Sequence, residues 1–445
     1  MAPTSEDIAL CAARRQRVMD AMGGGVLLLA AAPERPRTWD IHYPYRPDSD
    51  FHYLTAFPEP EAVCVLAPEV PERFVLFVRP RDPEREMWVG ARAGVEGAVA
   101  TYGADAAYKI DDLEQILPRF LEKAPHVHHT VLRDDPLATR LLALIRRAQE
   151  ARPRTGHGPT AIREPGDLLH EMRLRKAPEE IARMREAIGI ACEAHRTAMR
   201  TVRPGMREYE IEALIDYTFR RLGAVGPAYP SIVASGANAT VLHYTENDRT
   251  LGTDELLLVD AGAERGGYCA DVTRTFPTGR RYAGAARDLY QLVLAAQLAA
   301  VDTVAPGTTL EAVHKTALRV LVDGLLQLGL LKPTDAASAD EAIEKELYKR
   351  FFPHRTSHWL GRDVHDVGSY ARDGAPRPLE PGMVLTVEPG LYVPADAEDL
   401  PPAFRGIGIR IEDDVLVTAE RPEVLSASAP KQVDEIEALR AEAME

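Results

Sequence analysis

Two aspartates in apolar, strand-like segments are the first residues of this sequence that could do chemistry. Asp260 ends the apolar run 256–260, and Asp271 lies beyond a Gly-rich turn in the segment 267–273. A hairpin centred at 265.5 would place both aspartates opposite each other on one sheet face, with Cβ atoms roughly 4.5–5.5 Å apart. Facing carboxylates in apolar strands repel and are costly to bury unless a positive charge lies between them. The pair therefore predicts a metal site and disfavours two exposed edge acids.

Two glutamates further along the chain offer the same chemistry. Glu388 ends a strand-like run that begins at residue 383, and Glu412 lies in a β-branched strand within 408–415. Each half of this region would thus contribute two strand-borne acids. This correspondence favours both a duplication and a metal site that the two halves share.

The remaining ligand should come from the segment 352–365, which contains three histidines within twelve positions. The spacing of His354 and His358 resembles a zinc-protease helix, but Arg355 occupies the position that needs the catalytic glutamate. We therefore reject that interpretation. One imidazole with four carboxylates and no sulfur favours a pair of hard-to-borderline divalent ions, such as Mn²⁺.

The elements that must position these residues indicate an α/β (α+β) protein with two domains. Residues 1–172 alternate apolar strands with helices and form the predicted N-terminal mixed α/β domain, and residues 173–445 form the second domain. In the second domain, Pro-Gly breaks at 202–206 and 304–308 each divide one helix from the next, and strands follow each pair. We expect an internal repeat of a helix–helix–sheet unit.

Composition excludes several classes of function. The 445 residues carry 53 Lys plus Arg against 68 Asp plus Glu, a net charge of −15 that disfavours nucleic-acid and anionic-membrane partners. The four cysteines are widely spaced, which predicts neither a disulfide framework nor a thiolate metal site and fits a cytoplasmic protein. No apolar run approaches the ~20 residues that span a bilayer.

Five motifs follow one another along the second domain: LLLVDAG, GYCADVTRTFP, HRTSHWLGRDVHDVG, TVEPGLY and RGIGIRIEDDV. On these motifs, residues 178–440 resemble the pita-bread metallopeptidase family, and within it the aminopeptidase P group. The segment SDFHYLTAFPEPEAV resembles the accessory N-terminal domain of that group. The resemblance implies a pita-bread catalytic domain with an internal pseudo-twofold repeat, two divalent ions (most readily Mn²⁺), and a homo-oligomer, either a dimer or a tetramer.

The resemblance also implies a reaction and residue roles. The reaction would be hydrolysis of the N-terminal Xaa-Pro bond of peptides by a hydroxide that bridges two metal ions, with Glu388 as the proton shuttle. The implied metal ligands are Asp260, Asp271, His358, Glu388 and Glu412, of which Asp271 and Glu412 would bridge the ions. The implied substrate-binding residues are His243, His354, His365, Tyr392 and Arg410, and His365 would help to stabilise the carbonyl oxyanion.

Two other functions stay open on the sequence. A prolidase would cleave Xaa-Pro dipeptides with the same metal chemistry and would need a basic anchor for the free carboxylate, such as Arg355, Arg372 or Arg410. A non-catalytic binding module could also use this fold. Arg355 and Arg362 stand where many relatives have smaller or apolar residues, which puts the substrate preference in question.

Two features outside the motifs have simpler interpretations. His126, His128 and His129 are expected to be exposed loop or edge histidines, since no acid or cysteine pattern accompanies them. Trp88 is expected to pack, although the accessory domain of a neighbouring subunit can border the active site in such families, which keeps Trp88 as a candidate site residue.

Overall fold

The structure is a computed structural model that describes residues 3–131 and 136–443. The chain divides into two compact units, Met1–Glu171 and Met172–Glu445. None of the described helices is both long and apolar enough to span a lipid bilayer.

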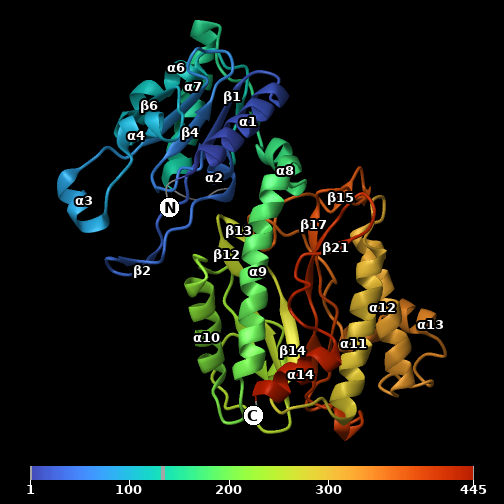
Figure 1. Cartoon of the computed structure of the whole chain (residues 1–445). Helices are drawn as coiled ribbons and strands as arrows, with labels where there is room; N and C mark the ends of the chain where they lie inside the picture. The colour runs from blue at the N-terminus through green and yellow to red at the C-terminus, as the bar shows by residue number, and fades with distance from the viewer. Residues whose placement is uncertain (1–2, 132–135, 444–445) are drawn as a thin grey trace. The chain divides into compact units, whose positions relative to one another are not determined.

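The N-terminal unit is built on a mixed six-stranded sheet with the order β6-β5-β4-β1-β7-β8 (Figure 1). Its strands are β1 (Val26–Ala30), β4 (Val63–Leu66), β5 (Phe74–Val78), β6 (Ala106–Lys109), β7 (Val127–His128) and β8 (Ile162–Arg163). Its main helices are α1 (Ser5–Ala21), α2 (Ser49–Thr55), α3 (Pro83–Val89), α4 (Gly94–Ala100), α5 (Leu113–Ile116), α6 (Pro118–Leu121) and α7 (Pro136–Thr155). A small hairpin of β2 (Pro36–Thr38) and β3 (Ile41–His42) stands apart from the sheet, and α8 (Gly166–Leu174) follows β8.

The central strands of this unit are continuous apolar runs because both faces of the sheet are covered. All five residues of β1 and of β5 are buried. One apolar cluster joins the sheet to α5, α6 and α7. The predicted mixed α/β character of the N-terminal region is confirmed.

The second unit repeats a helix pair followed by a small sheet. In the first half, α9 (Pro178–Thr201) and α10 (Glu208–Arg221) pack together and precede the sheet β10-β11-β14. In the second half, α11 (Gly284–Thr303) and α12 (Leu310–Gln327) pack together and precede the sheet β17-β20-β21. The short helices α13 (Ala339–Glu344) and α14 (Val433–Ala443) complete the helical part. The predicted duplicated architecture is confirmed.

The strands of the two halves lie between these helices (Figure 1). Those of the first half are β9 (Gly226–Pro227), β10 (Ile232–Ser235), β11 (Leu256–Asp260), β12 (Ala263–Arg265), β13 (Tyr268–Cys269) and β14 (Thr273–Pro277). Those of the second half are β15 (Ala371–Arg372), β16 (Ala375–Pro376), β17 (Val384–Val387), β18 (Gly390–Tyr392), β19 (Gly408–Arg410), β20 (Asp413–Leu416) and β21 (Glu423–Val424). One large apolar cluster runs from α9 through both sheets to α11 and α12. This shared core fixes the two halves against each other and positions the acids at their junction.

Candidate active site

The register of the first-half hairpin differs from the register that the sequence predicts. Asp260 pairs with Thr273, so the hairpin is centred at 266.5 instead of 265.5. The reason is the turn of Gly266 and Gly267, whose φ angles of 60° and 75° suit a two-residue turn of the type I′ hairpin. The expectation that Asp260 and Asp271 are direct cross-strand partners is therefore wrong.

The two aspartates nevertheless act as neighbours. Asp271 is offset by two residues from Thr273, the partner of Asp260, and side chains two residues apart share a face of the sheet. The hydroxyl of Tyr229 lies 2.6 Å from Oδ1 of Asp260 and 2.6 Å from Oδ1 of Asp271. One half-buried phenol thus joins both carboxylates.

The other acids lie at the ends of strands, where the chain changes its pairing partner. Glu388 directly follows β17, and Glu412 lies between β19 and β20, so the expectation that Glu412 lies within a strand is wrong. The physical reason is that β19 pairs with β18 whereas β20 pairs with β17. At this switch the backbone N–H of Glu412 donates to the carbonyl of Thr273 in the other half, at 3.1 Å. The break in the strand therefore places Glu412 at the junction of the halves.

Three of the predicted ligands converge closely. One potential ligand atom from each of Asp271, His358 and Glu412 lies within 4.8 Å of the other two. Nε2 of His358 lies 3.3 Å from Oδ2 of Asp271 and 3.6 Å from Oε1 of Glu388. Nδ1 of His358 lies 3.1 Å from the carbonyl oxygen of Trp359, which can only accept, so Nδ1 carries the hydrogen and Nε2 faces the carboxylates.

A cation would stabilise the ionised form of the buried carboxylates in this cluster. Burial raises the pKa of Glu388 to about 7, and the charge of Asp271 adds to this rise. Burial, with the charges of Asp271 and Glu388, also raises the pKa of Glu412 well above its usual value. Burial alone would lower the pKa of His358, but its hydrogen bond to Asp271 and the charges of Asp271 and Glu388 raise it to about 9.

These observations fit a metal centre. Several carboxylates and one imidazole converge in a buried region, and the imidazole presents its Nε2 to carboxylate oxygens. A hydrogen bond from Nδ1 to a carbonyl is the arrangement that orients a metal-binding histidine in proteins. Oxygen-rich ligand sets with one nitrogen suit hard-to-borderline divalent ions.

A directional chain of hydrogen bonds borders the cluster. Nη1 of Arg410 donates to the hydroxyl of Tyr392 at 3.0 Å, and Tyr392 lies 2.9 Å from Nε2 of His354. Nδ1 of His354 lies 2.8 Å from the carbonyl of Arg355, so Nε2 is the acceptor and Tyr392 the donor. Burial, then Arg410, lowers the pKa of His354 to about 4, which keeps the ring neutral near pH 7. The structure thus brings together three of the residues predicted to line the substrate site.

The remaining two predicted substrate residues lie near this group. The rings of His365 and His358 are 4.4 Å apart, edge to face. His243 is exposed on the segment after the 3₁₀ turn Gly236–Thr240. The charge of His243 is among the influences that lower the pKa of both His354 and His365, after burial as the largest cause in each. His243 therefore lies within electrostatic reach of both His354 and His365.

Sequence reasoning missed two contacts of the cluster. Tyr229 lies in the irregular segment before β10, and its residue type and position contain no signal that it bonds to two aspartates. Arg410 also donates from Nη2 to Oδ2 of Asp260 at 2.6 Å, besides its contact with Tyr392. An arginine in an otherwise apolar strand two residues before Glu412 is a signal that could have pointed to this pairing.

Arg355 and Arg362, which depart from the family pattern, and Arg372, a possible carboxylate anchor, have different environments. Arg355 and Arg372 are exposed, whereas Arg362 is buried with its guanidinium 5.2 Å from the ring centroid of Tyr268. A cation over an aromatic face is a stabilising packing arrangement. For Arg362 the structure thus indicates packing as the main role.

The histidine cluster of the N-terminal unit contradicts the sequence-based expectation. His126, His128 and His129 are all at least 95% buried. The reason is that β7 lies between β1 and β8 and so is an interior strand of the sheet. Trp88, by contrast, is 87% exposed on α3, so within its own unit it does not pack as expected.

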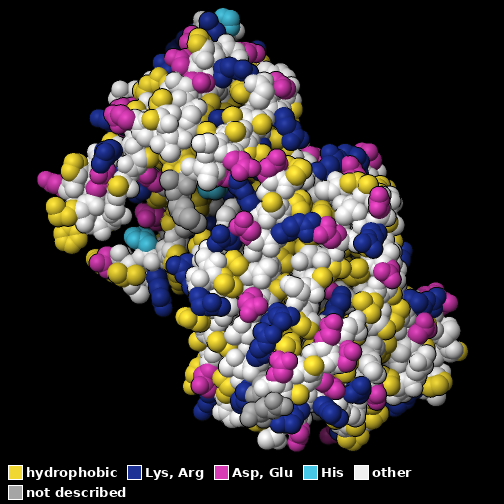
Figure 2. Space-filling view, viewed as in Figure 1, with side chains coloured by type: hydrophobic (Ala, Val, Ile, Leu, Met, Phe, Trp, Pro, Cys, Tyr) yellow, Lys and Arg dark blue, Asp and Glu magenta, His cyan; other side chains and the backbone are white. Residues whose placement is uncertain are grey.

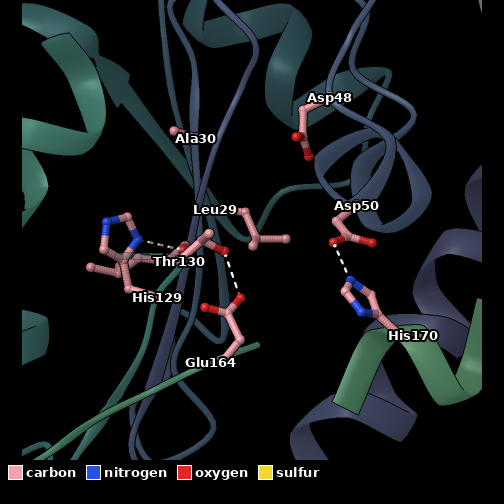
Figure 3. A pocket seen from close by; sticks show the side chains of 9 residues that line it. Leu29, Ala30, Asp48, Asp50, His129, Thr130, Glu164 and His170 are labelled. Atoms are coloured by element: carbon pink, nitrogen blue, oxygen red, sulfur yellow. Dashed lines mark hydrogen bonds and ion pairs between the residues drawn. The ribbon is translucent and has the colours of Figure 1, made fainter. Parts of the chain in front are cut away.

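A pocket of about 160 Å³ lies in the N-terminal unit (Figure 3). Its walls come from β1, the start of α2, the residues after β7, and α8. Nε2 of His170 lies 3.3 Å from Oδ2 of Asp50, and the hydroxyl of Thr130 donates to Oε1 of Glu164 at 3.0 Å. These pairings join the walls of the pocket.

Comparison with known proteins gives a consistent result. The model of metallopeptidase family M24 matches residues 182–419, and that of the aminopeptidase P N-terminal domain matches residues 11–128. The chain is 43% identical to the Xaa-Pro aminopeptidase of Escherichia coli K12 over 432 residues, which is 96% of each protein.

Solved structures agree over the full length. The aminopeptidase PepP of Pseudomonas aeruginosa superposes with a TM-score of 0.95, at 45% identity and 100% coverage of both chains. Aminopeptidase P from E. coli with the inhibitor Pro-Leu superposes with a TM-score of 0.93, at 42% identity, over 98% of this chain and 99% of that one.

Proposed function

The chain belongs to metallopeptidase family M24 and has an aminopeptidase P N-terminal domain, and we propose that it is an Xaa-Pro aminopeptidase. It would hydrolyse the bond between an N-terminal residue and a following proline. The observation that carries this proposal is the convergence of Asp271, His358 and Glu412 within 4.8 Å in a chain that matches Xaa-Pro aminopeptidases over nearly its whole length.

We propose that two divalent ions, most readily Mn²⁺, bind at this cluster. The residues that would hold them are Asp260, Asp271, His358, Glu388 and Glu412. When bound, the ions would supply Lewis-acid polarisation of the attacking water and of the scissile carbonyl.

Glu388 is the proposed proton shuttle of the reaction. The proline nitrogen has no N–H in the substrate amide and must gain a proton to leave. A carboxylate of the cluster can take a proton from the attacking water and deliver it to that nitrogen. Glu388 has suitable neighbours for this transfer, since Oε1 lies 3.6 Å from Nε2 of His358 and Oε2 lies 3.7 Å from Nδ1 of His354.

The histidines and the Arg410–Tyr392–His354 chain would bind the substrate. His365 and His243 would donate to the carbonyl oxygen as negative charge develops on it. The hydrogen-bond chain holds His354 as a neutral ring in a fixed orientation, which suits a wall of the proline pocket.

Three peptides test this function on the Mn²⁺-loaded protein: Xaa-Pro-Yaa, Xaa-Pro and Xaa-Ala-Yaa. We expect preferential cleavage of Xaa-Pro-Yaa that a chelator abolishes. Preference for the dipeptide would instead indicate a prolidase. Absence of cleavage with two ions bound would contradict the proposed substrate, and absence of both cleavage and metal would contradict the site.

A variant tests the role of Glu388 separately. Glu388→Gln keeps the shape and one oxygen but cannot act as a base, so we expect kcat to fall by about 10²–10⁴. The metal content must be measured in parallel, because Glu388 is also a proposed ligand. Full activity at full metal content would contradict the shuttle role.

We further propose a homo-oligomer, either a dimer or a tetramer. Met87, Trp88 and Val89 are 70–87% exposed on α3, and Trp39 is 98% exposed on the β2–β3 hairpin. Figure 2 shows hydrophobic side chains gathered on the outer surface of α3. Grouped exposed apolar side chains commonly mark protein contacts. Light scattering on Trp88→Ser and Trp39→Ser should show a lower mass than the wild type; a single-chain mass for the wild type would contradict the proposal.

We also propose a cytoplasmic location. All four cysteines are buried thiols, which fits a compartment that keeps thiols reduced. Fractionation of the source cells with an antibody against the protein tests this proposal, and recovery in a secreted or periplasmic fraction would contradict it.

A further inference from the structure

The segment that carries His243 has little regular structure of its own. Residues 241–249 lie outside the helices and strands, and the side chain of His243 is exposed. Tyr244 and Asn247 are its buried side chains, at 7% and 1% exposure. An exposed histidine on an irregular segment needs external anchors if it is to occupy one position.

The first anchor is Glu208, the first residue of α10. Glu208 is fully buried, and its Oε2 accepts from the hydroxyl of Tyr244 at 2.7 Å and from the backbone N–H of Arg249 at 2.9 Å. Its Oε1 accepts from the N–H and the hydroxyl of Ser235 at 2.7 and 2.6 Å, and from Asn238 at 3.3 Å. One carboxylate thus joins the end of β10, the 3₁₀ turn and two positions of the His243 segment, Tyr244 and Arg249.

Two features of its surroundings favour a negative charge on Glu208. It stands at the N-terminus of α10, where the helix dipole favours a negative charge. Arg249 supplies positive charge, and its Nη1 donates to the same Ser235 hydroxyl at 2.6 Å. An ionised carboxylate has acceptor capacity for all these donors, whereas an amide does not.

The second anchor is Glu212, one turn further along α10. Its Oε2 accepts from Nδ2 of Asn247 at 2.9 Å. Asn247 has a φ of 48°, and its Oδ1 accepts from the N–H of Val233 at 3.0 Å. Residues four apart on a helix lie on the same face, so α10 presents both carboxylates to the segment.

We propose that Glu208, assisted by Glu212, is a positioning residue that holds the segment 241–249 so that His243 reaches the substrate. The role of His243 in this proposal rests on the proposed peptidase function, whereas the anchoring of residues 241–249 by Glu208 does not. Glu208 is not a ligand of the metal centre and contributes through hydrogen bonds to the segment. Its removal should therefore alter catalysis through His243 while it leaves the metal content unchanged.

Glu208→Gln is the direct test. The amide nitrogen of Gln would face either the donors of Ser235 and Asn238 or those of Tyr244 and Arg249. Because a donor cannot accept from a donor, the hydrogen bonds on that side must break, and residues 241–249 should be held less firmly. We expect kcat/KM for Xaa-Pro-Yaa to fall by about 10–100-fold, because a small misplacement of a reacting group costs this much. The matched control is Ile215→Val, a buried residue of the same helix that belongs to the large apolar cluster and has no polar side-chain group to bond to the segment.

A double variant separates positioning from general structural damage. If Glu208 acts through His243, Glu208→Gln should add less than about twofold to the loss in a His243→Ala background. An equal fall in both backgrounds would overturn the proposal. Wild-type kcat/KM in His243→Ala would also overturn it, because His243 would then have no role that positioning could serve.

Hydrogen exchange gives a readout that does not depend on peptidase activity. In Glu208→Gln, the amides of residues 241–249 should exchange at least about tenfold faster, and in Ile215→Val they should exchange as in the wild type. Unchanged exchange in Glu208→Gln would overturn the proposal. If the wild type cleaves no peptide, the proposed function fails, while exchange still decides whether Glu208 holds the segment.

Discussion

The phenolic oxygen of Tyr229 lies 2.6 Å from Oδ1 of Asp271, and it bonds equally closely to Oδ1 of Asp260. A hydroxyl has a single hydrogen to donate, so it can be shared between the carboxylates but cannot satisfy both at once. Burial, with the charges of Asp260 and Asp271, raises the pKa of Tyr229 well above its usual value, so the phenol stays protonated. Tyr229 thus orients two proposed metal ligands from outside the metal centre.

Tyr229→Phe should weaken metal binding while the fold persists. Loss of a partner that orients metal ligands typically lowers affinity by about 10–100-fold. Competition titrations of Mn²⁺ against a chelator would measure this change. Tyr217→Phe is the matched control, since Tyr217 is 62% exposed on α10. An affinity equal to that of the wild type would show that the Tyr229 hydroxyl does not support the ligands.

Metal removal should lower thermal stability as well as activity. Without cations, the carboxylates of Asp271, Glu388 and Glu412 repel one another in a buried region. Mn²⁺ at about 100 times its Kd should stabilise the native state by about 2.7 kcal/mol, which calorimetry would detect as a higher Tm. The control is the double variant Asp271→Asn/Glu412→Gln, for which Mn²⁺ should leave Tm unchanged. The same Tm for the wild type with and without Mn²⁺ would contradict the metal site.

His195 should make stability depend on pH. It is fully buried in α9, and Nε2 lies 3.1 Å from the carbonyl oxygen of Ala261. Burial, with the charge of Arg274, lowers its pKa to about 4, against about 6.5 in an unfolded chain. Between these values the unfolded chain binds a proton that the native protein does not. Stability is therefore full above about pH 6.5 and declines as the pH falls toward 4, by roughly 2 kcal/mol at pH 5.

Urea denaturation at pH 7 and pH 5 measures this dependence. His195→Gln should reduce the difference in unfolding free energy between the two pH values. The exposed His157 is the control position, and His157→Gln should leave the difference as in the wild type. An unaltered difference in His195→Gln would mean that other groups cause the decline.

Arg274 should contribute more to stability than an exposed arginine in a comparable ion pair. Nη2 of Arg274 lies 2.7 Å from Oδ1 of Asp413, and both side chains are fully buried. Arg274 also donates to the backbone carbonyls of Thr273 and Ala429. Its removal leaves these acceptors without that donor and leaves Lys431 as the remaining cation on Asp413, so Arg274→Met should cost about 3–5 kcal/mol. Arg350 pairs with Asp399 at 2.6 Å, but both side chains are about half exposed, and Arg350→Met should cost at most about 1 kcal/mol. Equal costs in denaturation experiments would contradict this difference.

Local patterns in the sequence determined the architecture and the set of candidate residues. Apolar runs predicted buried strands such as β1 and β5, and the breaks at 202–206 and 304–308 predicted the paired helices of the two halves. Four acids and a histidine in apolar segments predicted a metal centre, because such residue types are costly to bury without a cation. These inferences depend on periodicity and composition, which are local properties of the chain.

Tertiary structure decided how those residues meet. The turn at Gly266 and Gly267 set the register that offsets Asp271 from the partner of Asp260, and the change of strand partner placed Glu412 at the junction of the halves. The contacts of Tyr229 with the aspartates, of Arg410 with Asp260, and of Glu208 with the His243 segment join residues 31 to 150 positions apart. Side-chain contacts at such separations arise only when distant segments pack together, and no local pattern encodes which partners will meet.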